Sequence, residues 1–423
     1  MKRTLTGLVL GLGIFFLALG TAKAAEEQKP PTAEQKPAEP ADKPLGPGWL
    51  SLDSIVGPLD NGIGNGKGAL EKALGIGISG YFDTSYTWSS NHPKNPSSIS
   101  GRYFDKDYNK VEFNDFHIVL DKPEKDWGVG FHFSGDFGRT GELLREATLW
   151  RKNFQHEPSA ELREAYITTT IPIGEGIQFK GGLFVTPQGT EIIPAPGSYN
   201  DNISRSFAFN YAIPFRHLGT LFSYPFLKTL TASAGVVTGW DNPHDNNGAP
   251  SGIVGINFTP ADSFALASNV ILGPEQTHNT NHQRLTWSNV ATIKPADALT
   301  LLLEYTLGFE SDASTPTGTQ DAWWHAFAGI ASYNWTERFN TALRAELFLD
   351  SQAARTGGLG ATRTMHNALL SEFTLTGTYK FTKMFLGRAE FRQDLANHPV
   401  FKKSSNGADS NQTTLALQLI YQY

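Results

Sequence analysis

From about residue 76 to Tyr423 the chain repeats one pattern, in which apolar and polar residues alternate between tight turns and long polar loops. The last segment shows the alternation most clearly. One face carries Leu415, Leu417, Leu419, Tyr421 and Tyr423, and the other carries Thr414, Ala416, Gln418, Ile420 and Gln422. Side chains of a β-strand point alternately to its two faces, so each segment predicts a strand with one apolar face. Short turns at one rim and long loops at the other are typical of a barrel that crosses a membrane.

This pattern predicts an all-β fold, a transmembrane antiparallel up-and-down β-barrel of about 16 strands over residues 76–423. We place the strands near 76–88, 111–121, 126–137, 161–171, 176–186, 216–224, 229–240, 250–259, 262–273, 283–294, 297–309, 322–335, 337–349, 366–381, 383–394 and 411–423. Tight turns rich in Pro, Asp and Gly connect them at the expected periplasmic rim. A soluble sandwich would show the same period. The export signal, the loop asymmetry and the aromatic last strand favour the barrel.

The first 75 residues divide into three parts. Residues 1–24 have a basic start, an apolar stretch of about 12 residues and an Ala-Lys-Ala cleavage site, which predicts a secretory signal peptide. Residues 25–47 are rich in Pro, Glu and Lys and predict a disordered periplasmic spacer. Residues 48–75 predict a partly helical segment, for which a plug of the barrel mouth and packing on the periplasmic rim stay open as alternatives.

Composition excludes several classes of function. The chain has no cysteine, so disulfides and cysteine-based metal sites or catalysis are excluded. The net charge of −6 argues against a nucleic-acid partner. Motifs for a phosphate loop, a zinc protease or a serine hydrolase are absent or lack their context, so we expect no cofactor, no metal and no enzyme.

Four stretches resemble the β-barrel porin-2 (OmpL-like) family. They are residues 78–88 (ISGYFDTSYTW), 163–193 (REAYITTTIPIGEGIQFKGGLFVTPQGTEII), 204–226 (SRSFAFNYAIPFRHLGTLFSYPF) and 234–242 (AGVVTGWDN). The resemblance covers most of residues 76–423. It implies a barrel in the outer membrane of a Gram-negative bacterium and passive diffusion, but no particular substrate.

The third outer connection, residues 187–215, is the longest and carries an unusual number of apolar groups for a solvated loop. We predict that it folds inward and packs on the barrel wall, with a short helix over 204–211 capped by Asn202. The alternative is a loop that packs on its neighbours or on another subunit. Inward folding brings Glu191 and Asp201 to a constriction.

Further charged residues lie on the strand faces that we assign to the lumen. These expected pore-lining residues are Arg344, Glu346, Arg388, Glu390, Arg392, His132, Asp136, Glu164 and Lys180. Opposed charges across a narrow wet pore tune its ion preference, and their mixed sign predicts weak selectivity. The alternative is that they form salt bridges that stiffen the wall.

The sequence therefore predicts an outer-membrane porin, a water-filled channel for passive diffusion of small hydrophilic solutes or ions. A barrel enzyme (protease or lipase), in which His132 and Asp136 would form part of the catalytic group, and an adhesin or structural tether are the alternatives. Expected partners are outer-membrane lipid, the solutes, and the outer-membrane assembly machinery, which would read the C-terminal strand 411–423. A homotrimer is expected only by analogy with other sixteen-strand porins.

Overall fold

The structure is a computed structural model, and it describes residues 74–93, 98–124, 128–147, 160–193, 200–357, 359, 367–404 and 407–423. The predicted signal peptide, the spacer and nearly all of the 48–75 segment lie outside these residues. Among the helices in the described part of the chain, none is long and apolar enough to cross a membrane.

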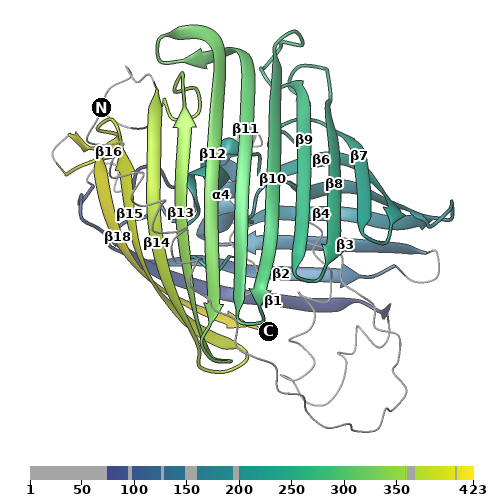
Figure 1. The fold of residues 1–423 in the computed structure, drawn as a ribbon, viewed down its shortest axis with the longest axis horizontal. Helices are drawn as coiled ribbons and strands as arrows, with labels where there is room; N and C mark the ends of the chain where they lie inside the picture. The colour runs from purple at the N-terminus through teal and green to yellow at the C-terminus, as the bar shows by residue number, and fades with distance from the viewer. Residues whose placement is uncertain are drawn as a thin grey trace. The chain divides into compact units, whose positions relative to one another are not determined.

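Sixteen antiparallel strands close into a barrel in which each strand pairs with its sequence neighbours and the first pairs with the last (Figure 1). The strands are β1 (Gly77–Ser89), β2 (Val111–Lys122), β3 (Val129–Phe137), β4 (Ala160–Ile171), β5 (Ile177–Val185), β6 (Arg216–Leu227), β7 (Leu230–Val237), β8 (Ser251–Ala261), β9 (Phe264–Pro274), β10 (Gln283–Ala296), β11 (Leu299–Thr315), β12 (Gly318–Asn334), β13 (Phe339–Asp350), β14 (Ala368–Lys380), β15 (Phe385–Ala396) and β18 (Asn411–Gln422). Between β15 and β18 the chain adds a small two-stranded sheet of β16 (Phe401–Lys402) and β17 (Ala408–Asp409). The predicted fold class and the number of strands are confirmed.

The two faces of the wall differ as the alternation predicted. On β18, Leu415, Leu417 and Leu419 are exposed on the outside, whereas Thr414 and Gln418 are buried on the inside. The same division runs round the barrel, because large apolar side chains dominate the exposed face of almost every strand. This outer belt suits hydrocarbon, and the polar inner face suits water or other polar groups.

Tyr423 completes the seam between the ends of the barrel. Its backbone exchanges two hydrogen bonds with Gly80, of 3.0 and 3.1 Å, and its ring lies 6.0 Å from that of Phe82 and 6.2 Å from that of Phe116. A Cβ on Gly80 would lie 2.5 Å from the Tyr423 hydroxyl oxygen and 2.1 Å from the carbonyl oxygen of His117. Only glycine therefore lets the terminal tyrosine lie across this part of β1.

Among the described residues, one α-helix and one π-helical turn add to the strands. The sequence did not predict α4 (Arg139–Ala147), which follows β3 and buries Leu143 and Leu144 completely. The expected helix over 204–211 is instead a single π-helical turn, η3 (Ala208–Ala212), and the Ser206 hydroxyl accepts the N–H of Phe209 at 3.0 Å. Asn202 does not act as the cap, because its Oδ1 accepts no hydrogen bond within the described residues and its Nδ2 donates to the Thr376 hydroxyl at 2.8 Å. The prediction of that cap was wrong.

A charge placed on the outer face tests whether this face meets lipid. We expect Leu417→Arg, at a residue 60% exposed on the outside of β18, to destabilise the folded barrel by about 2–4 kcal/mol if the site lies near the bilayer midplane. Urea unfolding in lipid vesicles measures this cost. The control is Asn411→Arg at the exposed end of the same strand, which we expect to change stability little. Equal costs for the two variants would contradict a lipid-facing belt.

Candidate functional site

The connection between β5 and β6 lies against the polar face of the wall. We call its described residues, 186–193 and 200–215, the inner segment. Thr190 donates to Glu304 of β11 through both its backbone N–H and its hydroxyl, each at 2.9 Å. Farther along, Asp201 accepts a hydrogen bond from Ser332 of β12, and the carbonyl of Asn200 accepts one from Arg388 of β15. These partners stand on the face opposite the exposed apolar one, so the inner segment is attached to the inside of the wall.

Two wall carboxylates hold the backbone of the inner segment. Glu390 of β15 accepts hydrogen bonds from the N–H groups of Ile203 and Ser204, at 2.6 and 3.0 Å. One turn farther along the segment, Glu346 of β13 accepts the N–H groups of Phe207, at 2.6 Å, and of Ala208. Hydrogen bonds from N–H groups to a carboxylate are stronger than neutral ones. The bonds to Glu346 lie at the start of η3, where the first N–H groups of a helical turn have no partner within the turn.

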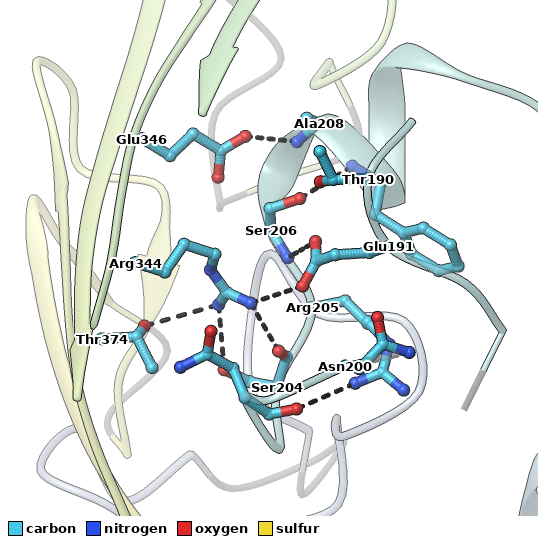
Figure 2. A network of polar contacts seen from close by, with 12 residues as sticks. Thr190, Glu191, Asn200, Ser204, Arg205, Ser206, Ala208, Arg344, Glu346 and Thr374 are labelled. Atoms are coloured by element: carbon cyan, nitrogen blue, oxygen red, sulfur yellow. Dashed lines mark hydrogen bonds and ion pairs between the residues drawn. The ribbon is translucent and has the colours of Figure 1, made fainter. Parts of the chain in front are cut away.

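Arg344 of β13 joins the wall to the inner segment (Figure 2). It is fully buried, and it contacts Glu191 of the segment at 2.6 Å and Glu372 of β14 at 2.5 Å. The same guanidinium donates to the carbonyl of Ser204 at 2.6 Å. Glu191 in turn accepts the N–H of Ser206 at 2.8 Å. A buried charge is tolerated only when it is paired and its hydrogen bonds are satisfied, and this network meets that condition.

Two more arginines of β15 continue the attachment. Arg392 contacts Asp394 at 2.6 Å and donates to the carbonyl of Arg205 at 2.5 Å. Arg388 donates to the carbonyl of Asn200 at 2.6 Å and contacts no carboxylate within the described residues. Burial lowers the pKa of Arg205 to about 10, so this side chain remains a cation at neutral pH.

The apolar side chains of the inner segment enter a hydrophobic cluster shared with the outer connections. The cluster contains Phe207, Phe209, Ile213 and Phe215 of the segment, Leu143 and Leu144 of α4, and Phe104, Trp324, Phe348 and Phe401. Trp324 also donates its indole N–H to the carbonyl of Ala212 at 3.1 Å. This region of the interior is therefore packed rather than wet, which the alternation of the strands alone did not predict.

The remaining predicted residues lie on the walls of β3, β4 and β5 and do not join this network. His132 lies 3.1 Å from Asp121 and 3.5 Å from Glu164, and its ring stacks on that of Tyr166 at 5.0 Å. Lys180 places its ammonium 4.4 Å from the centre of the Tyr166 ring. The structure thus divides the predicted pore-lining residues into one group under the inner segment and a second group on another part of the wall.

Asp136 belongs to a third arrangement. It accepts from Arg163 at 2.9 Å and lies 2.8 Å from His117, so the combination of His132 with Asp136 considered for an enzyme is not formed. Asp115, His117 and Asp136 lie close enough together to share a metal ion. Arg163 contacts both of these aspartates, however, and already supplies the positive charge that a metal would bring.

The sequence analysis missed several residues of these three arrangements, among them Glu372, Asp394, Glu304, Arg163 and Arg102. Asp394 stands on β15 in the same phase as Arg392, and Glu372 on β14 lies opposite Glu346 of β13. Glu304 stands on the polar face of β11, so the alternation could have found all three. Arg102 lies in an outer connection and contacts Asp394 at 2.8 Å. Alternation of apolar and polar residues identifies inward-facing side chains only on strands, so it cannot identify a residue in a connection.

Removing one wall carboxylate tests whether it holds the segment. We expect Glu346→Ala to free the N–H groups of Phe207 and Ala208, because each hydrogen bond to a charged group contributes about 1.5–3 kcal/mol. Amide hydrogen exchange at these two residues should accelerate at least about tenfold, by the usual conversion of free energy to rate. Glu337→Ala, at an exposed glutamate in the turn between β12 and β13, is the matched control. Unchanged exchange in Glu346→Ala would mean that the carboxylate does not fix the segment.

Comparison with known proteins agrees with this architecture. The DcaP outer-membrane channel of Acinetobacter baumannii is 12% identical with a TM-score of 0.55, and the match covers 82% of this chain and 97% of that one. An anion-selective porin from Comamonas acidovorans is 10% identical with a TM-score of 0.52, covering 82% and 99%. OmpT of Vibrio cholerae, in a structure described as its trimer form, is 11% identical with a TM-score of 0.52, covering 82% and 99%. Identities this low show a shared fold and nothing more.

A search of curated proteins gave no match. A family model does match, over residues 75–423, which is nearly the whole barrel together with its connections. The earlier resemblance is thereby confirmed, and the chain belongs to the family described as putative beta-barrel porin-2, OmpL-like.

Proposed function

We propose that the chain forms a water-filled channel in the bacterial outer membrane, through which small hydrophilic solutes or ions diffuse passively. The observation that carries this proposal is a closed sixteen-strand wall with an exposed apolar belt outside and a polar inner face, in a member of a porin family. A barrel of this size is large enough to leave an aqueous passage. The mechanism is sieving by width, and no cofactor or chemical step is needed.

The inner segment is the element that we propose narrows the passage. Its attachment to β13 through Arg344 and Glu346, and to β15 through Glu390, supports a fixed constriction rather than a mobile flap. Residues under the segment would then shape the passage indirectly, by holding the backbone in place. Asp201 of the segment and His132, Glu164 and Lys180 of the wall are the charged groups that we propose influence permeating ions, whereas Glu191 is buried against Arg344 and positions the segment.

Weak ion selectivity is part of this proposal. Arg344 and Arg392 each contact a carboxylate at 2.6 Å or less, so their charges are compensated locally. His132 lies between two carboxylates in the same way. Pairs of opposite charge leave a smaller net field in the lumen than a ring of one sign.

We further propose that the protein has no enzymatic activity, and an outer-membrane protease or lipase is the alternative. His132 and Asp136, the pair considered for such an enzyme, each bind other partners. An adhesin or tether is the second alternative, and it would use the outer connections. An intact set of hydrolase substrates after incubation with purified protein would count against the enzyme.

Assembly forms the last part of the proposal. We propose a homotrimer, supported by a similar structure that is described as a trimer, and recognition of strand 411–423 by the outer-membrane assembly machinery. Size-exclusion chromatography coupled to light scattering gives the number of subunits directly.

The channel itself is tested by solute entry. Liposomes that contain the purified protein should swell in small sugars, and the swelling rate should fall steeply as the sugar becomes larger, since the passage acts as a sieve. In planar bilayers with a KCl gradient, the reversal potential should stay near zero because the lumen charges are paired. Liposomes that do not swell in any sugar would refute the channel, and a large reversal potential would refute only the weak selectivity.

Strand 411–423 is tested through its last aromatic. The Tyr423 ring contacts two other rings, and such contacts contribute about 0.5–1.5 kcal/mol each beyond burial. We therefore expect Tyr423→Ala to lower the yield of folded barrel severalfold, as measured by the heat-dependent shift in gel mobility. Tyr423→Phe keeps the ring and should fold nearly as well as the unchanged protein. Equal yields of the alanine variant and the unchanged protein would contradict this role.

A further inference from the structure

The arginines that meet the inner segment are mostly neutralised or enclosed. Arg344 and Arg392 contact carboxylates and are completely buried. Arg205 and Arg388 contact no carboxylate within the described residues, but both are buried, and both donate to backbone carbonyl oxygens. Arg355 belongs to neither group, which makes it unusual on this side of the wall.

Arg355 lies in the connection that follows β13, at the rim of the long loops. Its Nε donates to the carbonyl of Tyr211 in the inner segment at 2.8 Å. Its terminal nitrogens, Nη1 and Nη2, have no hydrogen-bond partner in the part of the chain that the structure describes. They are not among the buried unpartnered atoms, and the side chain is only partly buried. The open end of the guanidinium therefore meets solvent.

Two indole rings fix the direction of this guanidinium. Its central carbon lies 4.8 Å from the centre of the Trp240 ring and 5.5 Å from that of Trp324. The two rings meet edge to face at 6.4 Å. Arg284 also lies over Trp240, at 4.9 Å, but Glu310 neutralises it through two hydrogen bonds of 3.0 and 2.9 Å. Arg355 is thus preorganised by aromatic contacts without being neutralised.

The nearby carboxylates are engaged elsewhere. Asp350 accepts N–H groups of the turn that follows it, including that of Arg355 itself at 2.8 Å. Asp241 accepts the N–H groups of Phe215 and Arg216, at 2.6 and 2.9 Å. Burial raises the pKa of Asp241 to about 6, and burial followed by the charge of Arg284 lowers the pKa of Arg355 to about 10. At neutral pH, Arg355 is still a cation without a contacting counter-ion.

We propose that Arg355, held against Trp240 and Trp324, binds the carboxylate group of small organic acids at the outer end of the passage. The terminal nitrogens of a guanidinium form a planar fork that matches the two oxygens of a carboxylate. The half-buried indole of Trp240 offers apolar surface to the body of such an acid, and the fully buried Trp324 supports the guanidinium from below. This inference rests on the proposed channel, and it makes Arg355 a residue that distinguishes organic anions from neutral solutes of the same shape.

Benzoate and benzamide are suitable probes, because they share a shape and differ in charge. With the full-length protein in planar bilayers, benzoate added on the side of the long loops should interrupt the single-channel KCl current in a concentration-dependent manner. Benzamide should not do so. Arg355→Gln should raise the benzoate concentration needed for half-maximal interruption at least about tenfold, which is the loss expected for one charge-assisted hydrogen bond.

Two further variants make the result specific. Arg355→Lys keeps the charge without the fork, so its benzoate response should be intermediate, and it serves as the test if the glutamine variant does not fold. Arg338→Gln removes an exposed arginine from the turn between β12 and β13, and its benzoate response should equal that of the unchanged protein. Open channels that benzoate does not interrupt, or an unchanged response in Arg355→Gln, would overturn this inference alone. Absence of any KCl current would instead overturn the proposed channel.

Discussion

The whole structure depends on one constraint: in hydrocarbon, a strand has no water to satisfy its backbone, so every N–H and C=O must find a partner in the protein. Closure of the barrel between β1 and β18 meets this constraint, with a register that runs from Tyr81 opposite Gln422 to Ser89 opposite Thr414. Gly80 and Tyr423 extend the same seam by two backbone hydrogen bonds. Without this pairing, two strand edges would be open to lipid, and the division into an apolar outside and a polar inside would have no basis.

Closure creates a second requirement on the inner face. Carboxylates and guanidiniums that point inward are confined together, and each must be compensated by water or by another group. In this barrel the inner segment supplies much of the compensation, through the N–H groups that reach Glu346 and Glu390 and through Glu191, which reaches Arg344. The hydrophobic cluster around Phe207 and Phe209 then excludes water from the attachment. The two kinds of contact hold the inner segment more firmly than either would alone.

Sequence reasoning located the strands well, because a period of two and turn residues such as Pro and Asp are local signals. The strand predicted near 216–224, for example, is present as β6 (Arg216–Leu227). The predicted helix cap in the inner segment was wrong because a residue distant in the sequence binds the backbone there. Asn202 has the composition of a helix cap, but Glu390, far along the chain, takes the N–H groups of Ile203 and Ser204. The lack of a counter-ion at Arg355 could not be predicted for the same reason. It arises because Asp350, Asp241 and Glu310, the carboxylates near it, bind other groups.

The way in which the wall holds the inner segment has a consequence for which substitutions this chain tolerates. Glu390 accepts hydrogen bonds from the backbone N–H groups of residues 203 and 204, and Glu346 from those of 207 and 208. Every amino acid except proline carries a backbone N–H group. Mutation can therefore exchange side chains of the inner segment while its anchorage to the wall persists. Sequence change in this short stretch leaves intact the scaffold of strands that supports it.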